Sequence, residues 1–98
     1  MNHLNPHEMA EAVVRMSNEY GEMSEKLADI LGKKALKWAE FRSHPDCKSD
    51  KAADKQWDAT PDGLTEMGLH LMLKACEKKM SALKAMLRVL ETEAHNQF

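Results

Sequence analysis

Three glutamates near the start of the chain are spaced as metal ligands on a helix would be. Glu19, Glu22 and Glu25 recur at every third residue, which places them on one side of a helix. Carboxylates on such a face can bind Mg²⁺, as a small all-α metal-dependent nucleotide hydrolase requires. A complete site needs matching acids on a facing helix, and the later glutamates lack that spacing: Glu66, Glu77, Glu91 and Glu93. We therefore assign the three glutamates to a solvated helix face and keep the hydrolase as a less favoured alternative.

The histidines and cysteines offer only part of a zinc site. His44 and Cys47 have the spacing of half a tetrahedral set, but His70 with Cys76 does not supply the other half. Two cysteines are too few for a disulfide framework, so we expect free thiols. Neither a glycine-rich phosphate loop nor the signature of an activated nucleophile is recognisable. The sequence therefore predicts no catalytic residue, no metal and no cofactor, and hence no enzyme.

Two runs of charged residues could meet a charged partner. Aspartates recur at every fourth residue in the middle of the chain: Asp46, Asp50, Asp54, Asp58 and Asp62. They could imitate the phosphates of DNA, but lysines interrupt them, and a solvated short helix is the preferred interpretation. The second half is mildly basic through Lys74, Lys78, Lys79, Lys84 and Arg88. Aromatic residues make up only 5% of the chain, so a stacking platform is missing and direct nucleic-acid binding is not expected.

The elements that position these residues begin with a long helix expected over 6–43. Asn5 can cap it, Pro6 suits the first helical position, and Glu8 completes a capping box. Apolar residues then recur at steps of three and four with one adjacent pair: Met9, Val13, Met16, Tyr20, Met23, Leu27, Ile30, Leu31, Ala35, Trp38 and Phe41. This spacing is typical of one packed seam. Gly32 predicts a bend or a break within the helix.

A connection with a short helix over 44–60 leads to a second long helix over about 61–95. Ser49 or Asp50 can cap the short helix, and Thr60 can cap the long one. The second long helix repeats the four-three rhythm: Leu69, Leu73, Cys76, Met80, Leu83, Leu87, Leu90 and Ala94. A further apolar set widens its stripe: Met72, Ala75, Ala82, Met86 and Val89. So broad an apolar arc predicts contact with more than one neighbour.

The composition predicts an all-α fold with a single domain over residues 1–98. Apolar residues make up 43% of the 98 residues and charged residues 31%, with only four Gly and three Pro. Two long helices in so short a chain predict a long antiparallel helical hairpin, coiled-coil-like, with a short connecting helix. The net charge of −2 favours neither nucleic acid nor a membrane surface. No apolar run reaches the length of a membrane span and no secretion signal is recognisable, so a cytoplasmic location is expected.

About half of the chain resembles small proteins encoded in the early recombination regions of temperate bacteriophages. The residues that carry the resemblance are Lys48-Ser49-Asp50, Trp57, Thr60, Gly63, Lys74-Ala75-Cys76-Glu77-Lys78-Lys79-Met80-Ser81-Ala82-Leu83-Lys84 and Leu87-Arg88-Val89-Leu90-Glu91. Within this group the chain is most similar to the anti-RecBCD proteins. That likeness implies a non-enzymatic helical accessory from a phage. It implies binding to the host RecBCD complex through the RecC subunit, and delivery of processed DNA to the phage recombinase.

The partner-binding residues are predicted from residue type and expected exposure. Methionine suits adaptable interfaces, and aromatic residues and Arg are enriched where binding energy concentrates. The candidates are Trp57, Met72, Lys79, Met86 and Arg88. Trp57 is expected to be exposed on the short helix, and packing over Trp38 and Phe41 is left open as the alternative. A lone hairpin cannot cover both apolar stripes, so a homodimer is a further expected assembly, and a self-assembling structural coiled coil is the alternative function.

Overall fold

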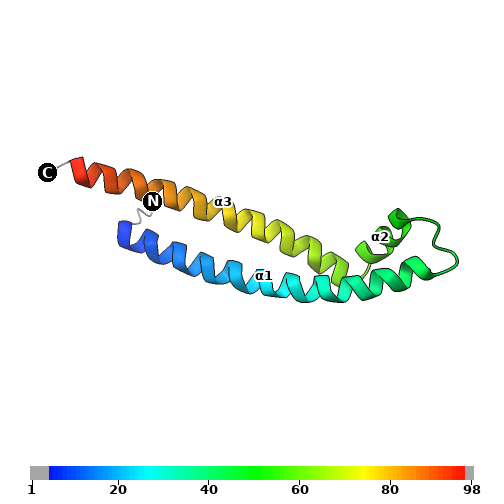
Figure 1. The fold of residues 1–98 in the computed structure, drawn as a ribbon. Helices are drawn as coiled ribbons and strands as arrows, with labels where there is room; N and C mark the ends of the chain where they lie inside the picture. The colour runs from blue at the N-terminus through cyan, green and yellow to red at the C-terminus, as the bar shows by residue number, and fades with distance from the viewer. Residues whose placement is uncertain (1–4, 97–98) are drawn as a thin grey trace.

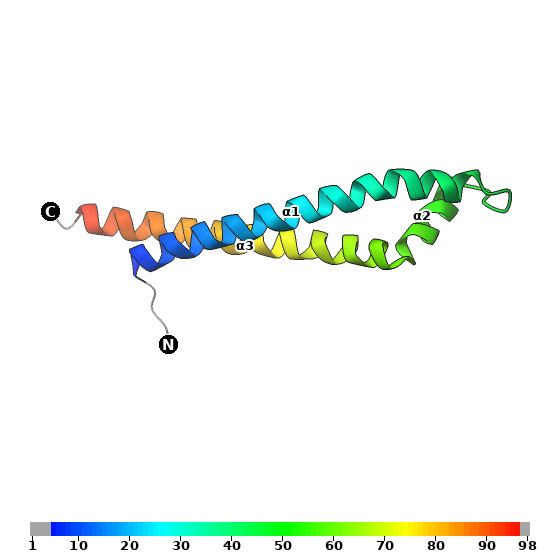
Figure 2. The same cartoon turned by 90° about the horizontal axis from the view of Figure 1, so that it is seen from below.

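The computed structural model describes residues 5–96, and this part of the chain is an antiparallel hairpin of helices. The long helices are α1 (Pro6–Ser43) and α3 (Pro61–Asn96), and the short helix α2 (Asp50–Asp58) lies in the connection between them (Figure 1). The predicted all-α hairpin with a short connecting helix is confirmed. The molecule is a rod of 73 × 23 × 19 Å, and its long helices cross at a shallow angle when seen from below (Figure 2).

The ends of α1 are fixed by the residues that the sequence indicates. The side chain of Asn5 accepts a hydrogen bond from the Glu8 amide at 2.8 Å, and Glu8 accepts one from the Asn5 amide at 3.2 Å. This reciprocal pair is a capping box, which satisfies amides that the first turn leaves free. The helix ends at Ser43, since His44 precedes Pro45 and adopts an extended backbone.

Of the bend or break expected at Gly32, the break is absent, because α1 runs without interruption through that residue, while the helix curves along its length (Figure 1). A glycine inside a helix costs only about 1 kcal/mol relative to alanine. Packing of the neighbouring Ile30 against Trp57 and Leu69 offsets that cost. The local preference of one residue is therefore overridden by tertiary contact.

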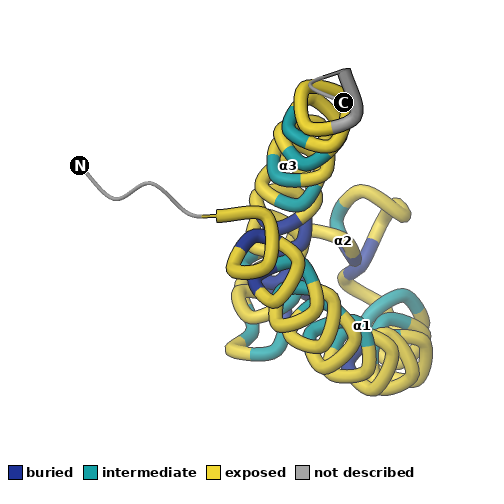
Figure 3. Tube along the Cα trace, turned by 90° about the vertical axis from the view of Figure 1, so that its left-hand side faces the viewer, coloured by how far each residue is buried: buried dark blue, intermediate teal, exposed yellow. Residues whose placement is uncertain are grey.

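Polar contacts fix the alignment of α1 with α3. The Tyr20 hydroxyl donates to Glu77 at 2.7 Å, and this hydrogen bond raises the pKa of Tyr20. The Ser17 hydroxyl donates to the sulfur of Met80 at 3.5 Å. The buried inner faces of the two helices meet along this line, whereas their outer faces are exposed (Figure 3). The hairpin therefore has a narrow core with solvent on most of its surface.

In its last third the predicted seam of α1 is wrong at Leu31 and Ala35 and confirmed at Trp38 and Phe41, which are half-buried. Leu31 is 42% exposed and Ala35 is also exposed, although both were expected to face the core. Beyond Ile30 the helix faces α2 as well as α3, and the half-buried positions become Lys34 and Trp38. A change of neighbour along one helix shifts the contacting face, which a single repeat cannot describe.

The turn from α2 into α3 depends on one glycine. The Thr60 hydroxyl donates to the Trp57 carbonyl at 2.6 Å and accepts from the Gly63 amide at 3.0 Å, so Thr60 caps α3. Gly63 is buried against the same carbonyl, and a Cβ atom at residue 63 would overlap it. The first turn of α3 can approach Trp57 only because residue 63 lacks a side chain.

We expect Gly63→Ala to lower the free energy of unfolding by about 2 kcal/mol, since the added methyl group must push α3 away from α2. Thermal unfolding followed by circular dichroism measures the change. Gly32→Ala is the matched control, because nothing lies within 4 Å of its Cβ position. That control should gain about 0.5–1 kcal/mol through helix propensity alone. Equal stabilisation of both variants would contradict the close contact at Gly63.

Candidate functional site

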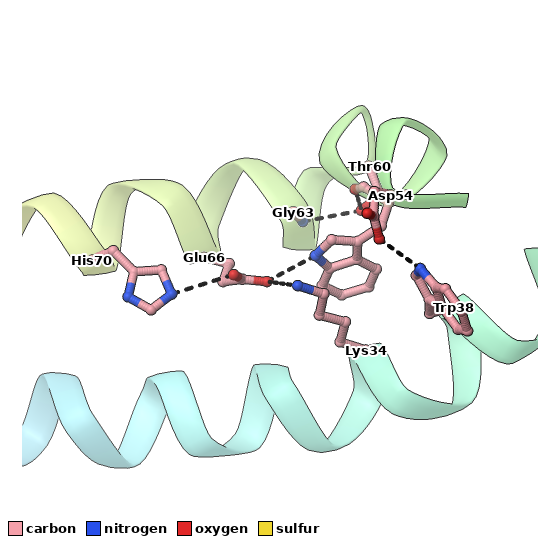
Figure 4. Close-up of polar contacts among 8 residues, drawn as sticks. Lys34, Trp38, Asp54, Thr60, Gly63, Glu66 and His70 are labelled. Carbon is pink, nitrogen blue, oxygen red and sulfur yellow. Dashed lines mark hydrogen bonds and ion pairs between the residues drawn. The ribbon is translucent and has the colours of Figure 1, made fainter. Parts of the chain in front are cut away.

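Trp57 is buried, so the expectation that it is exposed on the short helix is wrong, and the alternative that it packs near Phe41 is confirmed. Its side chain is only 1% exposed and packs with Ile30 and Leu69 in the central apolar cluster. The indole nitrogen donates a hydrogen bond to Glu66 at 2.8 Å (Figure 4). Burial removes a large apolar ring from water, and Glu66 satisfies the one polar group that is buried with it.

Glu66 joins all three described helices at this corner. It lies 3.1 Å from the Lys34 ammonium of α1 and 3.3 Å from His70, one turn further along α3 (Figure 4). Burial acts to raise the pKa of Glu66, but the hydrogen bonds from Trp57, Lys34 and His70 and the charge of Lys34 outweigh it, so the pKa is lowered. We call these four residues the corner network: the contacts of Glu66 with Trp57 and Lys34 hold helices together, and His70 binds Glu66 within α3.

From the sequence, Glu66 is recognised only as an acid without metal-ligand spacing, and its structural role is missed. One signal was present, since this acid lies seven residues before Leu73 and therefore on the seam of α3. A carboxylate on a packed seam requires a buried partner. The identity of those partners, Trp57 and Lys34, depends on how the helices meet and could not be derived from spacing.

Two aspartates of the acidic run hold α2 against α1. Asp54 accepts a hydrogen bond from the Trp38 indole at 2.8 Å (Figure 4). Asp50 accepts from the Arg42 guanidinium, also at 2.8 Å, and this hydrogen bond raises the pKa of Arg42. Asp50 and Asp54 therefore have a structural role, which the regular spacing of the five aspartates did not indicate.

The candidate metal ligands are not brought together. Within residues 5–96, no three side chains of His, Cys, Asp or Glu are arranged to hold a metal ion. The Cys47 thiol donates to the Ser49 carbonyl at 3.4 Å, and the Cys76 thiol donates to the Met16 carbonyl at 3.4 Å. Both thiols are free and buried in separate parts of the hairpin.

The remaining candidates lie on an exposed stripe of α3 that we call the outer face. Its members repeat at steps of four and three: Gly68, Met72, Ala75, Lys79, Ala82, Met86 and Val89. Met72, Met86 and Val89 are 56%, 49% and 56% exposed. Lys79 belongs to the stripe and Arg88 borders it, and both are exposed. Four of the five predicted partner-binding residues therefore lie on or beside one surface, and Trp57 does not.

The outer face is bordered by positive charge on α3 and by mostly negative charge on α1. Between Gly68 and Val89, the exposed charged residues of α3 on or beside the stripe are basic: Lys74, Lys78, Lys79 and Arg88. A groove with a volume of about 380 Å³ separates the stripe from α1, and Glu19 and Glu22 line its α1 wall together with Lys26. The surface thus combines apolar side chains with separated positive and negative edges, which suits binding to a macromolecule more than chemistry on a small one.

Comparison with known proteins returned no match to a protein-family model, to a curated protein or to a solved structure. Within the described range, no helix has an apolar stretch long enough to cross a membrane. The function must therefore be argued from the geometry and the sequence pattern.

We expect Glu66→Gln to lower the free energy of unfolding at neutral pH by about 1–2 kcal/mol, since the charge that Lys34 and His70 meet is removed. In the native chain the pKa of Glu66 lies below its ordinary 4.5, so its contribution is complete above that value and lost as the pH falls through the lowered pKa. Urea unfolding between pH 3 and pH 7 should therefore show a shallower acid loss in the variant, within the acid range of about pH 3–5.

Glu40→Gln is the control for this measurement, because Glu40 forms an exposed ion pair with Lys37 at 3.3 Å. Its effect should remain within about 0.5 kcal/mol. Identical pH profiles for the native chain and the Glu66 variant would show that the corner network does not stabilise the fold.

Proposed function

We propose that this chain is a non-enzymatic phage protein that binds the host RecBCD complex through the RecC subunit, using the outer face of α3. The observation that carries the proposal is the gathering of Met72, Lys79, Met86 and Arg88 on that exposed surface. Flexible thioethers beside positive charge suit an uneven protein surface with acidic patches. The resemblance of residues 48–94 to phage recombination-region proteins supplies the identity of the partner.

The shape of the hairpin supports a role by contact. The polar groups of the corner network and of the α2 contacts bind other side chains of the same chain, so they are committed to the fold. A rod of this length, held rigid at one end, can lie along a subunit and obstruct or redirect the DNA that passes there. Such an action in the bacterial cytoplasm would favour the recombination of phage DNA without any reaction carried out by the hairpin itself.

We expect the double variant Met72→Ala with Arg88→Glu to weaken RecBCD binding at least tenfold, since it removes an apolar anchor and reverses a charge. The measurement is biolayer interferometry with purified RecBCD and immobilised hairpin, at moderate salt. Helicity by circular dichroism must be unchanged in the variant.

The matched control is Val14→Ala with Lys55→Glu, because Val14 is 59% exposed on α1 and Lys55 is exposed on α2. This pair makes the same two kinds of change away from the outer face and should bind as the native chain does. Native hairpin that shows no affinity for RecBCD would refute the proposal, and equal losses in both variants would refute the assignment to this face.

A further inference from the structure

The hairpin exposes far more surface than a compact chain of its mass. Its accessible surface is 7555 Å² for 11.1 kDa, whereas the general scaling for folded monomers gives about 5,700 Å². The excess of about 1,900 Å² falls within the area of about 1,000–2,500 Å² that each protomer buries in an obligate dimer. The amount of exposed surface therefore matches what a second copy would cover.

The outer face has the pattern of a second seam, with large and small residues at alternate positions. Met72, Lys79 and Met86 are large, and the positions between and before them are small: Gly68, Ala75 and Ala82. When two such stripes pack antiparallel, each large residue lies opposite a small one. Parallel packing would instead place Lys79 against Lys79 of the second copy, which opposes like charges. The stripe therefore favours an antiparallel pair.

We propose that a second copy of this chain packs antiparallel on the outer face of α3, forming a four-helix bundle with two-fold symmetry. The axis passes beside residues 80 and 81, so that Lys79 lies opposite Ala82 and Ala75 opposite Met86 of the second copy, and the apolar Met72 meets the apolar Val89. A two-fold axis perpendicular to α3 keeps both α1 helices on the same side. The two hairpins thus close into a square bundle, and the groove between α1 and the outer face becomes its interior.

The charges of α1 agree with this alignment. The contacts Tyr20–Glu77 and Ser17–Met80 fix which residue of α1 lies beside each residue of α3. The same two-fold axis crosses α1 between residues 16 and 17, so Arg15 lies within one residue of the level of Glu19 of the second copy, and Glu8 within one residue of the level of Lys26. All four side chains are exposed in the single hairpin. Opposite charges are neighbours at both positions, so the alignment that sets Lys79 and Met86 against alanines also brings positive charges near negative ones.

A protein that docks on the outer face must displace the second copy. The self-association does not depend on which protein docks on the outer face. Only the competition between that docking protein and the second copy rests on the proposed function. Oligomeric state is measured on the hairpin alone and RecBCD binding in a separate experiment, so failure of one is distinguishable from failure of the other.

Sedimentation equilibrium of the full chain, from low micromolar to near-millimolar concentration, should give a mass that rises from 11.1 kDa to twice that value and no further. Met72→Lys with Met86→Lys should keep the chain monomeric at concentrations where the native chain is dimeric. The control is Val14→Lys with Leu31→Lys, which changes two exposed apolar residues of α1 outside the proposed interface. A native chain that stays monomeric throughout, or a control that loses the dimer while the outer-face variant keeps it, would overturn the proposal.

A mixing experiment tests the alignment and changes only exposed charges, so it remains decisive if the outer-face variant does not fold. Arg15→Glu alone and Glu19→Arg alone each place like charges across the interface, and each should dimerise weakly. An equimolar mixture restores both opposite pairs in the heterodimer, and its dissociation constant should be at least about tenfold lower than that of either variant. Repulsion within one helix is the same in the mixture, so only the contact between copies can give rescue. Absence of rescue would overturn the antiparallel alignment.

Discussion

The rest of the hairpin depends on the burial of Trp57 at the corner where its helices meet. Removing a buried tryptophan side chain typically costs about 3–5 kcal/mol, a large share of the stability of a small domain. Its indole nitrogen needs an acceptor, which Glu66 provides at 2.8 Å, and the charge of this half-buried carboxylate is met by Lys34. Gly63 then lets α3 begin against the carbonyl of the same tryptophan. Burial of this one ring thus accounts for the residue types at three other positions: the carboxylate of Glu66, the ammonium of Lys34 and the missing side chain of Gly63.

The features that the sequence predicted correctly are those decided locally. The capping box at Asn5 involves residues three apart, and the seam of α3 follows from a repeat within one helix. Trp57, Glu66 and the end of the α1 seam depend on contacts between helices, which no spacing within one helix reports. The candidate surface shows the same division. Met72 and Met86 were found from helical periodicity, whereas the burial of Trp57 required knowledge of where α2 lies.

The structure also explains why one apolar stripe of α3 is covered and the other is exposed. The seam that begins at Leu69 is covered by α1, and its alignment is fixed by polar contacts such as Tyr20–Glu77. The hairpin has no third long helix within residues 5–96, so nothing in this range covers the outer face. Covering an apolar stripe with another molecule removes its side chains from water and lowers the free energy. The absence of internal cover is thus the physical basis for both the proposed partner and the proposed second copy.

These two proposed occupants of the outer face follow from one requirement. Self-association removes Met72 and Met86 from water, and the apparent affinity for any other partner then falls in proportion to the fraction of free hairpin. That fraction rises as the protein is diluted, so a dimer with modest affinity remains competent at low concentration. At high concentration it protects the apolar stripe from unrelated surfaces. A stripe that alternates large and small residues would serve both proposed occupants, because large side chains of one copy can pack on alanines of the other while flexible methionines can still adapt to a differently shaped partner.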